Sequence, residues 1–183
     1  YGHLAFALAA QGRYPAADSA LKVLDSLLPE QPRALQMEAL LRSAQGDYAG
    51  ADSILRGILR TRSEPAYRQM ATGDRINIAL TQGRLAEAEG WATEMAAGAK
   101  QRGDTSLVYG ITIGEAIMDH TERPKPKRDL SGVEALLREY PLDSMPVDDR
   151  PYGALARLYA VAGQPDAAQR YLALDQKFQP RDW

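Results

Sequence analysis

Residues 46–51 read Gly-Asp-Tyr-Ala-Gly-Ala, a glycine followed five positions later by an alanine. The same pattern recurs at residues 12–17 (GRYPAA), 83–88 (GRLAEA) and 163–168 (GQPDAA). The glycines at 12 and 46 are 34 residues apart, those at 46 and 83 are 37 apart, and 80 residues separate 83 from 163. The longest interval has room for two repeats and an insertion. Self-similarity at this period indicates an array of helix pairs.

Each position of the pattern has a physical reason. The glycine tolerates a positive φ, so it ends one helix and lets the chain reverse. The small alanine lets the second helix lie close to the first, and apolar residues follow at helical spacing, as in Ala51, Leu55 and Ile58. Prolines stand between the repeats, where they stop one helix or begin the next; they are at 29, 32, 65, 151 and 180.

Residues 151–180, PYGALARLYAVAGQPDAAQRYLALDQKFQP, make the best single unit. Its large, small and helix-breaking residues are Tyr152, Leu155, Ala156, Tyr159, Gly163, Ala168, Leu172 and Pro180. In these positions the chain resembles tetratricopeptide repeat proteins, and the resemblance covers nearly its whole length. It implies an all-α fold, an α-solenoid of about five antiparallel helix pairs in a right-handed superhelix with a concave face.

The predicted domain is a single helical repeat domain over residues 1–183. Its units are approximately 1–31, 32–64, 65–102, 103–145 with an insertion at 121–128, and 149–180. The fourth unit has a helix from Asp104 to about His120 that no glycine turn follows, and a second helix from Asp129 to Tyr140. In the second unit Glu38 and Arg42 replace apolar residues and predict a surface ion pair. Arg75 predicts a longer or rotated first helix in the third unit.

Composition excludes several classes of function. The net charge of −2 gives no electrostatic basis for binding nucleic acid or an anionic membrane. No run approaches the roughly 20 apolar residues of a membrane-spanning helix. The absence of cysteine removes disulfides and thiolate sites and leaves the compartment open, with the cytoplasm favoured over an extracytoplasmic site. The chain begins without Met inside a predicted helix, so we expect a piece of a longer protein, and its alanine- and arginine-rich composition is typical of a bacterial source.

The sequence contains no residue pattern that predicts a catalytic, cofactor or metal site. The two histidines, His3 and His120, lack a partner at metal-ligand spacing. No phosphate-binding glycine motif or nucleophile elbow is present, and the acidic loop at 141–149 lacks the spacing of a calcium loop. The basic insertion Arg123–Arg128 fits either contact with an acidic or phosphate group or a stiff linker. We therefore predict no enzymatic activity.

The resemblance implies that a ligand binds to the inner side of the first helix of each pair. The groove candidates at these positions are His3, Phe6, Arg33, Gln36, Met37, Leu40, Asp74, Asn77, Arg150 and Arg157. Only Asn77 fits the clamp with which chaperone-binding members grip a carboxylate, and these helices carry no lysine. We predict no chaperone-tail binding. A helix or extended segment with apolar anchors and some acid suits the groove better.

These observations favour a module that binds another protein or peptide, within a regulatory or sensory part of a larger bacterial protein. Residues 138–168 resemble the C-terminal helical tails of some bacterial serine/threonine kinases, without contributing a catalytic residue. The alternative is a structural module that self-associates through apolar, uncapped repeat ends. An enzyme built on the repeats has no supporting set of residues.

Overall fold

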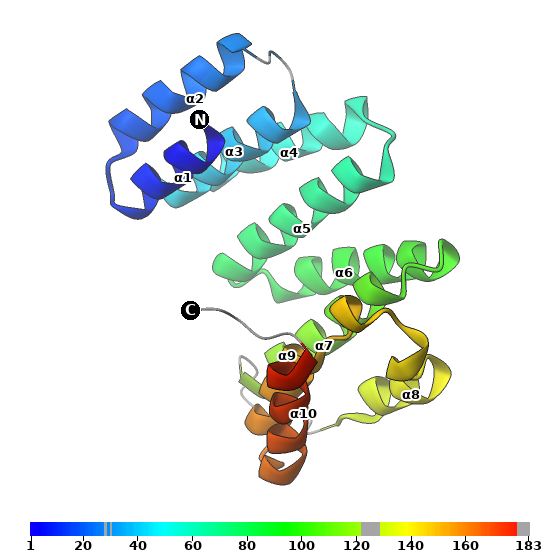
Figure 1. The fold of residues 1–183 in the computed structure, drawn as a ribbon. Coiled ribbons are helices and arrows are strands. Elements are labelled where there is room, and N and C mark those ends of the chain that lie inside the picture. Colours follow the sequence, from blue (N-terminus) through cyan, green and yellow to red (C-terminus); the bar gives the residue numbers. More distant parts are fainter. Residues whose placement is uncertain (28, 30, 122–128, 179–183) are drawn as a thin grey trace. The chain divides into compact units, whose positions relative to one another are not determined.

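The computed structural model describes residues 1–27, 29, 31–121 and 129–178 (Figure 1). Within these ranges all regular secondary structure is helical and no strand occurs, so the all-α prediction is confirmed. The α-helices are α1 (Gly2–Ala10), α2 (Tyr14–Leu27), α3 (Pro32–Ala44), α4 (Tyr48–Thr61), α5 (Pro65–Thr81), α6 (Leu85–Gln101), α7 (Thr105–Thr121), α8 (Ser131–Glu139), α9 (Tyr152–Val161) and α10 (Pro165–Phe178). Two short 3₁₀ helices, η1 (Leu142–Ser144) and η2 (Val147–Asp149), precede α9.

The chain divides into two compact units, Tyr1–Met95 and Ala96–Trp183, and the boundary falls within α6. The helices lie two by two within the five ranges predicted from the sequence, from α1 and α2 in 1–31 to α9 and α10 in 149–180. The single repeat domain and its superhelix stay predictions. No helix of the described ranges is long and apolar enough to cross a bilayer.

Five glycines have a positive φ and form the same helix-ending turn; they are Gly12, Gly46, Gly83, Gly103 and Gly163. In each turn the residue after the glycine donates its N–H to a carbonyl five residues back, as Asp47 does to Arg42 at 2.9 Å. This is the bond that satisfies a free carbonyl at the end of a helix. Four of the turns are those of the predicted pattern. The fifth, at Gly103 between α6 and α7, was not part of it.

In the first unit α3 is central, because it contacts α1, α2, α4 and α5 (Figure 1). The alanines five residues after the turn glycines, Ala17, Ala51 and Ala88, are completely or almost completely buried. Small side chains at these positions permit the close approach of helices that the sequence pattern predicts. The core around them consists of alanine and aliphatic residues, with Leu55 and Ile58 fully buried.

In the second unit α7 contacts α8 and α9, and α9 contacts α10. Its core is richer in aromatic residues than that of the first unit. Tyr109 is fully buried and donates its hydroxyl to Tyr140 O at 2.5 Å, and its burial raises its pKa to about 12. The rings of Tyr159 and Tyr171 stack with centroids 5.4 Å apart. A buried hydroxyl that reaches a carbonyl avoids the cost of an unsatisfied donor.

The sequence departs from the repeat pattern in the second and third repeats, and the structure shows the effect of each departure. The predicted Glu38–Arg42 pair is present on α3, with Arg42 Nη2 2.9 Å from Glu38 Oε1, and Arg42 also bonds to Asp47. Helix α5 has 17 residues against 13 in α3, so the longer first helix predicted for the third repeat (residues 65–102) is confirmed. Arg75 Nε on α5 lies 2.7 Å from Asp52 Oδ1 on α4 and forms an ion pair with it.

Candidate functional site

The candidate site begins on one face of α3. Pro32 occupies the first turn of this helix, where its fixed φ suits helix initiation and its missing N–H costs nothing. From there Arg33, Met37, Leu40 and Ala44 follow at spacings of four, three and four residues. Such spacing aligns side chains along one face of a helix. The face is polar near the start of α3 and apolar towards its end.

The apolar half of this face closes a pocket against α1. The pocket has a volume of about 140 Å³. The residues that line it all have apolar side chains and are Ala5, Phe6, Ala9, Ala10, Met37, Leu40, Leu41 and Ala44. Three predicted groove residues, Phe6, Met37 and Leu40, are thereby brought together. Four alanines leave the space that larger side chains would fill.

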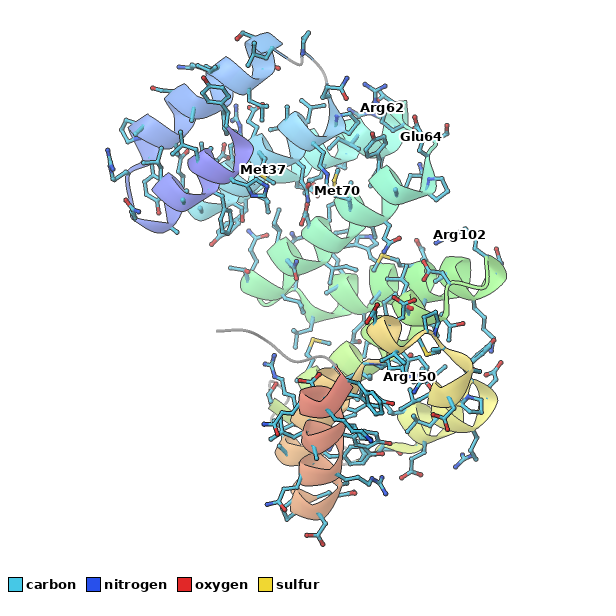
Figure 2. All side chains as sticks on the ribbon, in the orientation of Figure 1. Met37, Arg62, Glu64, Met70, Arg102 and Arg150 are labelled. Atoms are coloured by element: carbon cyan, nitrogen blue, oxygen red, sulfur yellow. The ribbon has the colours of Figure 1, made fainter. Side chains whose placement is uncertain are left out.

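Met37 lies between α1 and α3, where it packs against the core cluster of Ala5 and Leu41. A Cβ placed on Gly2 of α1 would lie 3.5 Å from Met37 Cγ, which is ordinary van der Waals contact. In Figure 2, Met37 lies beside α1 and Met70 lies on α5. Phe6, by contrast, is 62% exposed at the mouth of the pocket. The pocket is therefore lined by a partly buried methionine and an exposed aromatic side chain.

The polar half of the face contains a chain of hydrogen bonds that joins α3 to α5. Arg33 Nη1 donates to Gln36 Oε1 at 3.3 Å, and Gln36 Nε2 donates to Asp74 Oδ2 at 2.7 Å. Gln36 is buried, and both bonds agree on the orientation of its amide. Burial raises the pKa of Asp74, while the bond from Gln36 and the positive charge of Arg33 oppose that rise. The chain connects the guanidinium group of the exposed Arg33 to α5.

The remaining groove candidates of the first unit are solvent-facing. His3 on α1 and Asn77 on α5 are both exposed. The carbonyl of Asn77 accepts a hydrogen bond from Thr81 Oγ1 at 2.9 Å, as is common for threonine in a helix. Neither residue joins the pocket or the polar chain. They border the site without building it.

Arg150, in the second unit, forms hydrogen bonds with neighbouring residues of its own segment. Its side chain is 14% exposed, and its guanidinium donates to Met145 O at 3.0 Å and to Tyr152 Oη at 3.2 Å. Figure 2 shows its position beside the segment that precedes α9. Arg157 on α9 is exposed. The structure does not place either arginine with the residues of the α3 face, and Arg150 stabilises the 3₁₀ segment.

The exposure of α1 agrees with the apolar repeat end expected from the sequence, because Leu4, Phe6 and the preceding Tyr1 are each at least half exposed. Residues 2–10 contain no charged side chain apart from a histidine. Sequence reasoning missed the partner of Trp91 on α6. Arg75 stacks over its ring at 4.0 Å, so the indole packs against a cation that Asp52 neutralises.

The described residues show no cluster of three His, Asp or Glu side chains able to hold a metal ion. His120 Nδ1 donates to Ala116 O at 2.8 Å within its own helix. The basic insertion at 122–128 and Trp183 lie outside the described residues. The pocket and the polar chain of the first unit therefore form the candidate site.

Comparison of the chain with protein-family models, with curated proteins and with solved structures gives no match.

Proposed function

We propose that this chain is a protein-interaction module of the tetratricopeptide kind, which binds a segment of another protein on the face formed by α1, α3 and α5. The observation that carries the proposal is the apolar pocket between α1 and α3, next to the polar chain from Arg33 to Asp74. An apolar recess with a few convergent polar groups is the usual form of a recognition site.

Three features support the repeat and its superhelix. The turn motif recurs with one hydrogen-bond pattern, and a small buried residue follows the turn in the first three repeats. In the first unit α1 contacts both the next helix and the next but one, and α3 does the same. Such neighbour contacts are what a stack of helix pairs produces.

The size of the pocket limits the free energy that one anchoring side chain contributes to binding. Burying one leucine- or phenylalanine-sized side chain contributes about 1.5–3 kcal/mol. Association also costs several kcal/mol of translational and rotational freedom. One anchor is therefore insufficient by itself, and the partner segment also contacts the exposed Phe6 and the polar half of α3. We expect dissociation constants in the micromolar range, about −8 kcal/mol.

A blocked-pocket variant tests the proposal. Ala44→Leu places a larger side chain at the pocket, whereas Ala173→Leu makes the same change at an exposed site on α10. Peptides selected on the wild-type chain from a displayed library should lose at least tenfold in affinity, about 1.4 kcal/mol, with Ala44→Leu and none with Ala173→Leu. The proposal fails if the selection yields only peptides that bind both variants equally, or yields none.

A second candidate is self-association through α1. Tyr1, which precedes this helix, is 60% exposed, and Leu4 and Phe6 within it are 51% and 62% exposed. The only ionisable side chain of α1 is His3. An apolar patch without charge opposes its own copy with no electrostatic repulsion.

Sedimentation velocity over a range of concentrations tests this alternative. Self-association predicts a weight-average mass that rises with concentration in the wild type and stays monomeric in the Leu4→Glu, Phe6→Glu double variant. Leu172→Glu, at an exposed leucine of α10, is the matched control and keeps the wild-type behaviour. A wild type that remains monomeric throughout removes the alternative.

A further inference from the structure

Arg33 and the pocket lie on the same helix, and their separation follows from its geometry. On α3 the pocket is lined by Met37, Leu40, Leu41 and Ala44, whose mean position is seven to eight residues after Arg33. At 1.5 Å per residue this places the pocket about 11 Å along the helix from Arg33. A ligand that uses both features must span that distance.

Arg33 supplies the accessible charge of the site. Its side chain is exposed, and its bond to Gln36 uses one of the five donors of a guanidinium group. Asp74, the opposite charge, is half-buried and accepts from Gln36. A ligand therefore meets a cation whose planar fork suits a carboxylate. Because Gln36 is buried and held by α5, Arg33 loses less freedom on binding than an unsupported surface arginine.

The pocket accepts one bulky apolar side chain. Its volume of about 140 Å³ is close to that of an apolar cavity of about 150 Å³, which binds benzene. Leucine, methionine and phenylalanine match this size, whereas the two-ring side chain of tryptophan exceeds it. The apolar side chains of the lining disfavour a charged or amide anchor, because such a group would lose hydrogen bonds to water.

We infer that the partner segment is an α-helix that carries a carboxylate and a bulky apolar side chain seven residues apart. The inference rests on the proposed function of this face. Two helical turns bring both groups to one side and separate them by about 10.5 Å, which matches the spacing of Arg33 and the pocket. An extended segment fits less well, since its same-side spacings are about 6.6 and 13 Å. The carboxylate binds Arg33, and the apolar side chain enters the pocket.

Helical peptides of one composition test the spacing. The matched peptide carries Glu seven positions from Leu, in either order along the chain. The control peptide carries the same Glu five positions from Leu, on the opposite side of the helix. Fluorescence anisotropy should show about five- to tenfold tighter binding of one order of the matched peptide, the effect expected for a charge-assisted contact.

Variants of the protein assign that gain to Arg33. Arg33→Gln should reduce the matched peptide to the affinity of the control peptide, and Arg60→Gln, at an exposed arginine of α4, should change nothing. Arg33→Glu should prefer a peptide with Lys in place of Glu, which a purely structural role of Arg33 does not predict. The gain should also shrink as salt rises.

The outcomes separate this inference from the proposed function. Matched and control peptides that bind equally, lose affinity with Ala44→Leu and ignore Arg33→Gln overturn the helix-and-carboxylate inference and leave the binding face intact. Peptides whose binding does not depend on Ala44 overturn both. Rescue of Arg33→Glu by the Lys peptide, with Ala44→Leu still abolishing binding, supports both.

Discussion

Two arginines, one in each unit of the molecule, were predicted to face the groove, and their surroundings differ. Arg33, on α3 of the first unit, is exposed and touches a single buried glutamine. Arg150, before α9 of the second unit, is 14% exposed and bonds to the residues around it. The repeat position alone does not decide whether a side chain meets a ligand. The segment that leads into the helix decides it, because the 3₁₀ turns before α9 supply carbonyls that Arg150 satisfies.

The two cores differ in the same sense. Alanines line the contact of α1 with α3, and they leave a pocket of about 140 Å³. The core of the second unit contains four buried tyrosines, which are Tyr109, Tyr152, Tyr159 and Tyr171. Large side chains that reach hydrogen-bond partners give a closed core, whereas small ones leave room for a ligand.

The largest expected effects come from truncating one leucine in each core. Leu55 and Leu155 are both fully buried. Leu55→Ala and Leu155→Ala should each reduce the free energy of unfolding by about 3 kcal/mol, because each loses burial and leaves a cavity. Chemical denaturation measures the loss, and hydrogen exchange shows which amides lose protection. We expect the loss of protection around α4 and α5 for Leu55→Ala, and around α9 and α10 for Leu155→Ala.

That comparison breaks if both substitutions expose the same amides to the same extent, which would mean that the two cores unfold as one. Leu172→Ala, at a partly exposed leucine of α10, is the control and should cost much less.

A smaller effect distinguishes the two arginines. Arg150→Ala should reduce stability by about 1–3 kcal/mol, because it leaves the carbonyl of Met145 without its charged donor. Arg33→Ala should change stability by less than about 0.5 kcal/mol, as is usual for an exposed position. Thermal and urea denaturation of both variants measure the contrast. Equal losses would show that Arg33 is a structural residue and would remove the basis for its role in binding.

Much of this fold could be predicted from the sequence, because glycine turns and helical spacing are local signals. The turns at Gly12, Gly46, Gly83 and Gly163, the helix bounds and the buried alanines all follow from residues close together in the chain. Gly103 escaped because Val108, rather than alanine, stands five positions later. Its turn is made by the backbone alone, so no particular residue need follow it.

The site was predicted only in part, since it depends on contacts between distant residues. Register placed Phe6, Met37 and Leu40 on inward faces, and the pocket brings them together. The bond between Gln36 and Asp74 joins residues 38 apart, and spacing within one helix contains no information about it. The role of Arg150 was missed for the same reason, because its partners lie in an irregular segment.

The smallest expected effect concerns the carboxylate behind Arg33. Burial raises the pKa of Asp74 above its ordinary value of 3.8. The folded state therefore keeps a proton that the unfolded state has already lost, so this group makes stability fall as pH rises from 3.8 through the folded pKa. Asp47 has the opposite sign: the N–H of Gly50 and the charge of Arg42 lower its pKa, so its contribution is lost as pH falls through the folded pKa below 3.8.

Asparagine variants isolate these charges, because an asparagine oxygen still accepts the bond from Gln36 at position 74 and still caps α4 at position 47. The stability of Asp74→Asn relative to wild type should rise as pH increases from about 3.8, and that of Asp47→Asn should fall as pH increases towards 3.8 from below. Urea denaturation between pH 3 and 7 measures both difference curves, in which other titrating groups such as Glu115 cancel. Curves of the same slope would show that Asp74 is solvated like a surface carboxylate, and the polar chain would then no longer explain why Arg33 is held in place.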